Sequence, residues 1–419
     1  MIEIVKKLYK YNFWEGRAID CGFIRSSYLN KIQKYIGNDL IKVLVGQRRT
    51  GKSYILRQII QELINQGINA KNIFYLNKEL VDFDDIKTYR DLSKLVELYK
   101  KELKVRGKIF IFLDEVQEID GWEKVVNSFS QDYKNKYELF ITGSNSKLLS
   151  GELASYLSGR YISFEIMPFS FGEYCHYFSL SLSKESYLSY IKIGGLPELY
   201  KLHDEETRTN YVTSLQNTIL FKDIVQRYNI KDTYLLETVF KFLIDNIGKL
   251  FSINTVVGYF NSHKIKTNFE TISNYIEYLS QTFLIHGVER FDIKGKNILS
   301  RGKKYYVNDL SFKNYLSSSF DYGAGNILEN CIYLYYRSLG YTLYVGTIGS
   351  KEVDFIIEKG KEKKYIQVAY ALSDEKVIKR EFGNLEEIND NYEKIVVSLD
   401  DFSLGNKEGI SHIRVWELF

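Results

Sequence analysis

Cysteine and proline are scarce in this sequence, and their scarcity limits what the chain can be. Its 419 residues include three cysteines, Cys21, Cys175 and Cys331, which are far apart and odd in number. Such spacing argues against a disulfide framework and against a zinc ribbon, so we expect free thiols. With only two prolines there is no proline-rich linker, and changes of pattern must mark the domain boundaries instead.

The sequence also lacks a long apolar run and a strong charge of one sign. No stretch of about 18 apolar residues is free of charges, so we expect no transmembrane helix and no membrane partner. Glu3, Lys6 and Lys7 come too early for a secretion signal, and the predicted compartment is therefore the cytoplasm. The formal net charge of +4 does not by itself indicate nucleic acid. A chain of this length is too long for one core, so several domains are expected.

What the sequence does contain is a complete phosphate-binding motif between an apolar run and a helical pattern. Residues 46–53, GQRRTGKS, fit G-x-x-x-x-G-K-[ST] at every position. Gly46 and Gly51 let the backbone turn and approach phosphate, so that successive N–H groups can face the anion. Lys52 would reach the β- and γ-phosphates of ATP, and Ser53 would place its hydroxyl on Mg²⁺. The predicted cofactor-binding residues are Gly46, Gln47, Arg48, Arg49, Thr50, Gly51, Lys52, Ser53 and Tyr54.

Two carboxylates follow the apolar run 109–113, which is continuous, as in a strand buried on both faces of a parallel sheet. Ligands bind at the carboxyl ends of such strands, so Asp114 and Glu115 would arrive beside the phosphates. Asp114 would hold Mg²⁺, and Glu115 would be the general base toward the attacking water. Asn145, after the buried run 137–142, could hydrogen-bond that water, although Asn is also common in turns. The alternative interpretation is that Asp114 and Glu115 are solvated acids at the end of the strand, with no role in binding.

Alternating strands and helices predict a right-handed, mostly parallel, three-layer α/β fold for the first part of the chain. Arg160 stands at the entrance to the strand predicted at 162–166. Further short motifs are Leu113-Asp114-Glu115-Val116-Gln117, Thr142-Gly143-Ser144-Asn145, Leu157-Ser158-Gly159-Arg160, Pro168-Phe169-Ser170-Phe171-Gly172-Glu173-Tyr174 and Gly194-Gly195-Leu196-Pro197.

Together with the phosphate-binding loop, these motifs resemble a family of prokaryotic AAA-type ATPases that carry a C-terminal domain of unassigned function. The likeness covers nearly the whole chain. The resemblance implies an ATPase that works with Mg²⁺. It also implies a homo-oligomer, because an arginine at the position of Arg160 typically reaches the nucleotide of a neighbouring subunit in AAA proteins. The alternative for Arg160 is an ion pair with a local carboxylate.

A helical lid is predicted next, in which either Lys222 or Arg227 would touch the nucleotide. A winged-helix pattern follows, with a short helix that Ser252 caps, a longer helix at 268–285, and a ribbon. In DNA-binding relatives the second helix enters the major groove and the wing grips the backbone. The residues that could serve DNA phosphates are Lys264, Lys266, Lys294, Lys296, Arg301, Lys303 and Lys304. The alternative is a structural or protein-docking role.

The last part of the chain resembles the PD-(D/E)XK nuclease fold. In that fold a helix Glu, a strand Asp and a [DE]-x-Lys on the next strand gather Mg²⁺ around a scissile phosphate. Glu329 and Asp354 match the first two roles, whereas Gln367 stands in place of an acid and Ala369 in place of the lysine. A second Mg²⁺ site would comprise Glu329, Asp354 and Gln367. The lysines that could replace the missing one are Lys351 and Lys364.

The patterns together predict four parts: a P-loop AAA-type ATPase core (1–167), a helical lid (168–235), a winged-helix domain (236–323) and a nuclease-like α/β domain (324–419). Three functions remain open. The first is an ATPase that couples its nucleotide state to a DNA- or partner-binding C-terminal half. The others are a slow nucleotide-dependent binding switch and a nuclease that ATP regulates. The alternative to an active nuclease is a degenerate nuclease-like domain that only binds.

Overall fold

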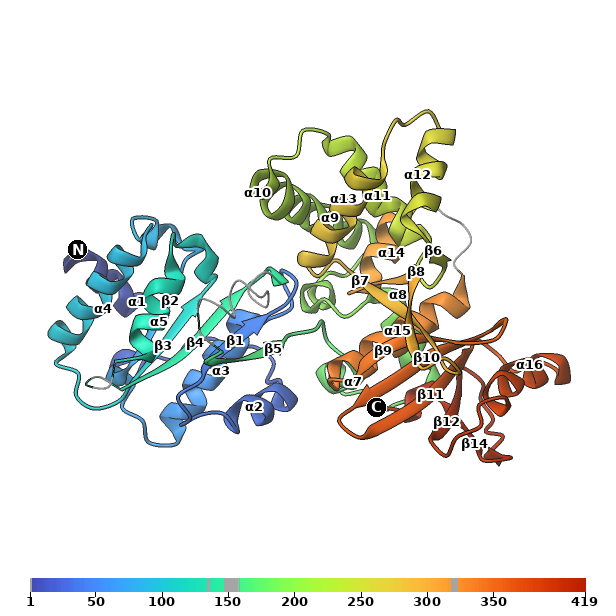
Figure 1. Cartoon of the computed structure of the whole chain (residues 1–419). Coiled ribbons are helices and arrows are strands. Elements are labelled where there is room, and N and C mark those ends of the chain that lie inside the picture. The colour runs from blue at the N-terminus through green and yellow to red at the C-terminus, as the bar shows by residue number, and fades with distance from the viewer. Residues whose placement is uncertain (1, 133, 135, 147–156, 158, 318–322) are drawn as a thin grey trace. The chain divides into compact units, whose positions relative to one another are not determined.

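The structure is a computed structural model that describes residues 2–132, 134, 136–146, 157, 159–317 and 323–419. The chain divides into two compact units, Met1–Ile166 and Met167–Phe419 (Figure 1). Each unit has a sheet of its own. Among the described residues, no helix is both long enough and apolar enough to cross a membrane.

A five-stranded sheet forms the centre of the first unit. Its strands are β1 (Ile41–Val45), β2 (Ile73–Asn77), β3 (Ile109–Asp114), β4 (Tyr137–Gly143) and β5 (Tyr161–Glu165). They lie in the order β2-β3-β4-β1-β5, and every neighbouring pair is parallel. The predicted parallel α/β core is therefore confirmed. Because all five strands run the same way, the loops after β1 and β3 meet at one edge of the sheet.

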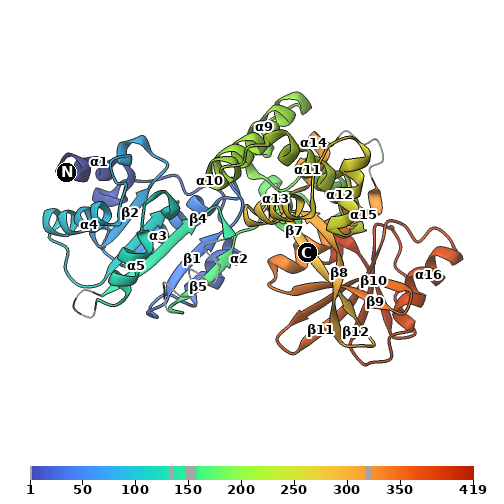
Figure 2. The ribbon, with the colours of Figure 1, turned by 45° about the horizontal axis from the view of Figure 1, so that its top comes forward.

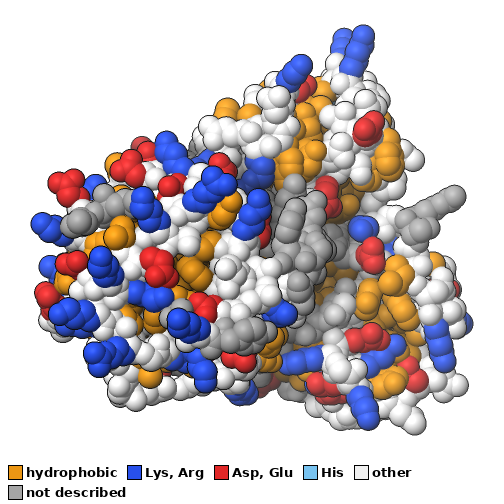
Figure 3. Space-filling model, turned by 60° about the vertical axis from the view of Figure 1, so that its left-hand side comes forward, with side chains coloured by type: hydrophobic (Ala, Val, Ile, Leu, Met, Phe, Trp, Pro, Cys, Tyr) orange, Lys and Arg blue, Asp and Glu red, His pale blue; other side chains and the backbone are white. Residues whose placement is uncertain are grey.

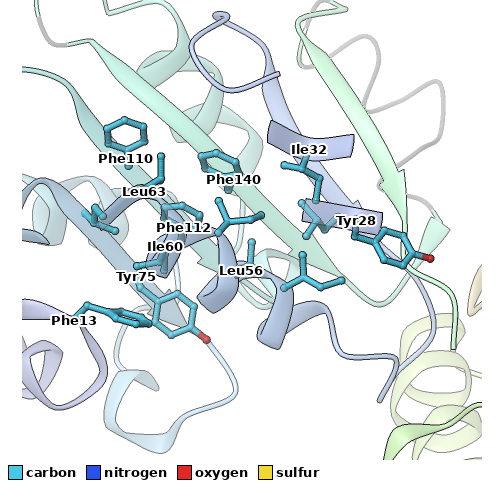
Figure 4. Close-up of a cluster of buried hydrophobic side chains, with 14 of the residues drawn as sticks. Phe13, Tyr28, Ile32, Leu56, Ile60, Leu63, Tyr75, Phe110, Phe112 and Phe140 are labelled. Carbon is cyan, nitrogen blue, oxygen red and sulfur yellow. The ribbon is translucent and has the colours of Figure 1, made fainter. Parts of the chain in front are cut away.

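The helices of this unit are α1 (Ile2–Tyr11), α2 (Ser26–Gln33), α3 (Lys52–Asn65), α4 (Tyr89–Leu103) and α5 (Trp122–Ser130). Leu56 and Ile60 of α3 belong to a buried cluster with Phe112 and Phe140, whose rings stack at 4.4 Å (Figure 4). Burial of each such side chain contributes about 1.5–3 kcal/mol. This packing fixes α3 on the sheet, and with it the loop that leads into the helix.

The second unit begins with helices and continues into one mixed sheet. Its helices are α7 (Phe171–Phe178), α8 (Lys184–Ile193), α9 (Glu205–Thr218), α10 (Gln226–Tyr228), α11 (Thr233–Asp245), α12 (Ile253–Ser262), α13 (Phe269–Gln281), α14 (Leu310–Leu316), α15 (Ala324–Ser338) and α16 (Glu375–Glu386). Its strands are β6 (Leu250–Phe251), β7 (Ile285–Asp292), β8 (Asn297–Val307), β9 (Thr342–Ile348), β10 (Lys351–Lys359), β11 (Glu362–Ala369), β12 (Glu393–Ser398), β13 (Asn406–Lys407) and β14 (Ile410–Arg414).

The hairpin of β7 and β8 belongs to the same sheet as the C-terminal strands (Figure 2). The order is β13-β14-β12-β11-β10-β9-β7-β8-β6, and β7 pairs in parallel with β9, with Arg290 opposite Val345. The sheet therefore crosses the boundary predicted between residues 323 and 324. The subdivision of this unit into lid, winged helix and nuclease-like domain stays a prediction.

The helix predicted at 268–285 is too long. In the structure α13 ends at Gln281, Phe283 takes a left-handed φ of 59°, and β7 begins at Ile285. The apolar residues 283–285 continue the helical pattern in sequence but enter the sheet instead. The short helix is as predicted, because the Ser252 hydroxyl accepts a hydrogen bond from the Thr255 N–H at 3.2 Å and caps α12.

The glycine pair Gly194-Gly195 has a packing role within this unit. The Gly195 N–H donates to the buried Asp309 carboxylate at 2.7 Å. A Cβ on Gly195 would lie 2.4 Å from the carbonyl oxygen of Phe169, and one on Gly194 would lie 2.5 Å from Asp309. Burial raises the pKa of Asp309 to about 6. The motif therefore joins the segment before α7 to the start of α14.

Candidate nucleotide-binding site

The loop between β1 and α3 has the backbone shape that its glycines predict. Gly46 has a φ of 147° and Gly51 a φ of 97°, a region that other residues rarely adopt. A Cβ on Gly46 would come within 2.3 Å of the carbonyl oxygen of Ile166. Gly51 directly precedes α3, so the N–H groups at the amino end of the helix lie at the loop.

Lys52 is the first residue of α3, and its side chain is buried in the loop. Its Nζ donates hydrogen bonds to the carbonyl oxygens of Gly46 and Gln47, both at 2.9 Å. The same nitrogen lies 3.8 Å from Oε1 of Glu115. Burial lowers the pKa of Lys52, and the negative charges of Glu115 and Asp114 act against this. The amine thus lies between the loop and the carboxylates that follow β3.

Asp114 ends β3 and is fully buried. The Tyr75 hydroxyl donates to its Oδ2 at 2.9 Å, and the Thr142 hydroxyl donates to its Oδ1 at 2.5 Å. Burial raises the pKa of Asp114 and so does Glu115, while hydrogen bonds from Thr142, Ser53 and Tyr75 oppose the rise. Ser53 and Asp114, the two predicted metal ligands, are therefore in contact. A hydroxyl and a carboxylate oxygen are a donor set that suits Mg²⁺.

Glu115 follows Asp114 with a left-handed φ of 55°. Its N–H donates to the Thr142 hydroxyl at 2.9 Å, and Gln117 donates from Nε2 to its Oε2 at 2.5 Å. Burial alone would raise the pKa of Glu115, but the positive charges of Lys52 and Arg48, together with hydrogen bonds from Gln117 and Ser144, lower it. The carboxylate is therefore ionised at neutral pH, as a general base must be.

Asn145 and Arg160 differ in where the structure places them. Asn145 is buried just beyond β4. Arg160 is exposed, and its carbonyl oxygen accepts from the N–H of Ile41 at the amino end of β1. The loop follows the other end of this strand, roughly 16 Å away at about 3.3 Å per residue. The structure does not bring Arg160 to the loop of its own chain, and its role toward a neighbouring subunit stays a prediction.

The other loop residues predicted to bind nucleotide differ in their surroundings. Thr50 is buried, and its hydroxyl donates to the Gln47 carbonyl at 3.0 Å. Arg49 is exposed. The ring of Tyr54 has the Arg57 guanidinium 4.2 Å from its centroid.

Three residues near the loop were not predicted. Tyr75 and Thr142 hold Asp114, and Arg25 is buried and donates from Nη1 to the Thr50 carbonyl at 3.0 Å. Thr142 and Tyr75 could have been found, because each lies near the carboxyl end of a predicted strand. Arg25 carries no such signal, because it precedes the sheet in a segment with only a weak apolar stripe.

The acids of the predicted second Mg²⁺ site surround a lysine instead. The Nζ of Lys304, on β8, lies 2.7 Å from Glu329, 2.8 Å from Glu352 and 3.7 Å from Asp354. The Tyr306 hydroxyl also donates to Glu329. Burial raises the pKa of both Glu329 and Asp354, against the charge of Lys304. Lys304, which was expected to be able to reach a DNA phosphate, is buried and cannot.

Gln367 faces other partners. Its side-chain oxygen accepts from the Asp354 N–H at 3.4 Å, and its nitrogen donates to Glu381 at 2.9 Å. The lysines proposed as replacements are ion-paired elsewhere: Lys351 with Glu387, and Lys364 with Glu362 and Glu393. Within the described part of the chain, no group of three or more His, Cys, Asp or Glu residues could hold a metal ion.

Two segments of the chain match family models. Residues 38–175 match the model of an AAA domain, and residues 184–322 match that of a domain of unknown function. An uncharacterised protein of Haemophilus influenzae is 34% identical over 395 residues, which are 93% of this chain and 97% of that protein. This chain belongs to a prokaryotic family of AAA-type P-loop ATPases. An uncharacterised protein of Methanocaldococcus jannaschii is 32% identical over 396 residues, 90% of this AAA-type chain and 84% of that protein.

Solved structures resemble the AAA-type chain more distantly. A Walker-type ATPase of Pyrococcus abyssi has a TM-score of 0.47 and 15% identity, over 70% of this chain and 96% of its own. The AMPPCP-bound DnaA of Aquifex aeolicus has a TM-score of 0.29 and 16% identity, over 65% of this chain and 91% of its own. The family membership rests on the sequence relatives.

Proposed function

We propose that this AAA-type chain is an Mg²⁺-dependent ATPase whose nucleotide state is coupled to a DNA- or partner-binding C-terminal half. One observation carries the proposal: Lys52, Ser53, Asp114 and Glu115 come together at the amino end of α3. The glycine loop and the helix end supply N–H groups for phosphate at the same place. The four residues have the chemistry that hydrolysis of a triphosphate needs.

Each of these residues has a separate task. The loop N–H groups and Lys52 bind the β- and γ-phosphates, while Ser53 and Asp114 would hold Mg²⁺. The metal, when bound, neutralises charge on the phosphates. Glu115 is ionised and accepts a proton from the attacking water, and Asn145 orients that water. The hydrogen bonds of Thr142 to both carboxylate residues keep them in place.

Exposed cations support DNA as the partner of the C-terminal half. Lys264 and Lys266 are exposed in the turn between α12 and α13, and Lys294 and Lys296 are exposed at the tip of the β7–β8 hairpin. On the face that Figure 3 shows, Lys and Arg side chains are interspersed with Asp and Glu. Lys303 is not among them, because it is paired with Glu289 at 3.1 Å.

ATP turnover measured with single-stranded, duplex and branched DNA at two salt concentrations tests this coupling. We expect one of these DNAs to raise the rate and salt to weaken the effect, because phosphate contacts release counterions. The double variant Lys264→Ala with Lys266→Ala should lose much of the response, and Lys303→Ala should keep it. An ATPase rate that none of these DNAs changes would contradict the proposal that DNA is the partner. ATP turnover too slow to measure would favour the nucleotide-dependent binding switch.

The lysine among the C-terminal acids supports binding without cleavage. The amine of Lys304 already forms ion pairs with Glu329 and Asp354, the carboxylates that would hold a divalent cation. We therefore expect plasmid DNA to stay intact when it is incubated with the protein and Mg²⁺ or Mn²⁺. Cleavage that disappears in the Asp354→Ala variant would contradict this proposal and would establish the nuclease.

A further inference from the structure

Arg48, the third residue of the loop, is held beside the carboxylates that follow β3. Its side chain is largely buried, and its Nη1 lies 2.6 Å from Oε1 of Glu79. Glu79 follows β2, and its N–H donates to the Asn77 side chain at 2.8 Å. The neighbouring N–H of Lys78 donates to the carbonyl oxygen of Asp114 at 3.1 Å. The acid that holds Arg48 is therefore tied to the end of β3.

The charge of Arg48 acts inside the phosphate-binding cradle. Burial is the largest influence on Lys52 and Glu115, and beyond it the charge of Arg48 lowers the pKa of both groups. Arg49, the next residue, carries the same charge but is exposed, with a left-handed φ of 69°. Of the two adjacent arginines, Arg48 is therefore the one whose side chain is enclosed with Lys52 and Glu115.

Glu79 is a weaker partner for Arg48 than a phosphate would be. The Glu79 side chain is 43% exposed, and ion pairs with such a solvated acid contribute little. A terminal phosphate carries more charge than a carboxylate, and its oxygens match the fork of a guanidinium in two parallel hydrogen bonds. A triphosphate in the loop would therefore compete successfully with Glu79 for Arg48.

We propose that Arg48 exchanges Glu79 for the γ-phosphate of bound ATP and stabilises, from within the same chain, the charge that develops there during hydrolysis. This proposal rests on the proposed ATPase function. In the step, the water oxygen bonds to the γ-phosphorus as the bond to the bridging oxygen breaks. ADP leaves with that electron pair, Glu115 takes the proton of the water, and Arg48 makes only hydrogen bonds.

ATP hydrolysis by the whole chain distinguishes the roles of the two arginines. Arg48→Ala is expected to lower kcat at least about tenfold, because a charge-stabilising donor is lost from the transition state. Arg49→Ala removes the same charge from the same loop. We expect this variant mainly to raise KM rather than to lower kcat. Arg48→Lys should recover part of kcat, because an amine keeps the charge but not the paired hydrogen bonds. Equal losses of kcat in Arg48→Ala and Arg49→Ala would overturn the proposal.

Glu79 provides a test whose sign distinguishes exchange from a merely structural ion pair. If Glu79 competes with the γ-phosphate, Glu79→Gln should increase the preference for ATP over ADP severalfold, whereas Arg48→Ala should decrease it. The gain from Glu79→Gln should vanish in the Arg48→Ala background. A structural pair predicts that both single variants weaken ATP binding, and that result would overturn the exchange.

The failure of this inference and the failure of the proposed function give different results. Hydrolysis by the unchanged protein that is lost in Lys52→Ala supports the ATPase whatever Arg48 does. If the unchanged protein hydrolyses no ATP, the ATPase proposal fails. In that case the ATP and ADP affinities of the Arg48 and Glu79 variants still decide whether the guanidinium contacts the γ-phosphate.

Discussion

Replacing Lys304 with methionine removes the only cation that the structure places within the cluster of Glu329, Glu352 and Asp354 among the described residues. Breaking a buried ion pair from one side costs about 3–5 kcal/mol, because a charge stays buried without its partner. The cost should lie at the lower end of this range, because the Tyr306 hydroxyl still donates a hydrogen bond to Glu329. Methionine keeps most of the apolar stem, so little packing is lost. We expect the C-terminal sheet to lose about 3 kcal/mol.

Hydrogen exchange of peptides from α15 and β10 measures this loss where it arises. A loss of about 3 kcal/mol makes exchange roughly a hundredfold faster than in the unchanged protein. Lys303→Met, one residue away, removes an exposed pair with Glu289 and should change stability by less than about 0.5 kcal/mol. Without its cation, each buried carboxyl has a pKa above that of the unfolded chain, so the cost should shrink as the pH falls from 7 toward 5. Equal exchange in the two variants would refute the role of Lys304.

Three further predictions concern the site and the packing. Thr142→Val should lower ATP turnover at least about tenfold, because Thr142 bridges the two carboxylate residues; unchanged turnover would speak against the bridge. The pKa of Asp309 in the folded protein is about 6, above its ordinary value of 3.8. Protonated Asp309 therefore stabilises the fold below about pH 4. This contribution, about 3 kcal/mol, is lost as the pH rises through 6. Thermal unfolding of Asp309→Asn should therefore depend less on pH between 4 and 6 than that of the unchanged protein. Gly195→Ala should cost about 1–3 kcal/mol because its Cβ would meet the Phe169 carbonyl, whereas Gly325→Ala, in open space on α15, should be neutral or stabilising in denaturant unfolding.

The core of the first unit was predictable because its strands are continuous apolar runs with clear ends. The run 109–113 lacks only Asp114, which closes β3, and the run 137–142 lacks only Gly143, which closes β4. In a parallel sheet the position of each strand's carboxyl end follows from its sequence, which is why Lys52 and Glu115 could be expected to meet. The contacts between strands, such as Tyr75 with Asp114, depend on side-chain direction and were not predicted.

The second unit was less predictable because its decisive pairings join distant parts of the chain. Lys303 and Lys304 are adjacent and alike in sequence, but β8 turns one outward and the other into the acidic cluster. Nothing local indicates that β7 pairs with β9, since that pairing depends on the whole sheet. The acids Glu329 and Asp354 do come together, as predicted. The cation between them is the Lys304 side chain of the β7–β8 hairpin rather than the predicted Mg²⁺ ion.

ATP hydrolysis by the Lys52→Ala and Glu115→Gln variants beside the unchanged protein tests the proposed ATPase most directly. We expect Mg²⁺-dependent phosphate release that Lys52→Ala abolishes. We expect Glu115→Gln still to bind ATP but to turn it over at least roughly a hundredfold more slowly, because the base is lost. Phosphate release that persists undiminished in Lys52→Ala would show that this loop does not carry the hydrolysis.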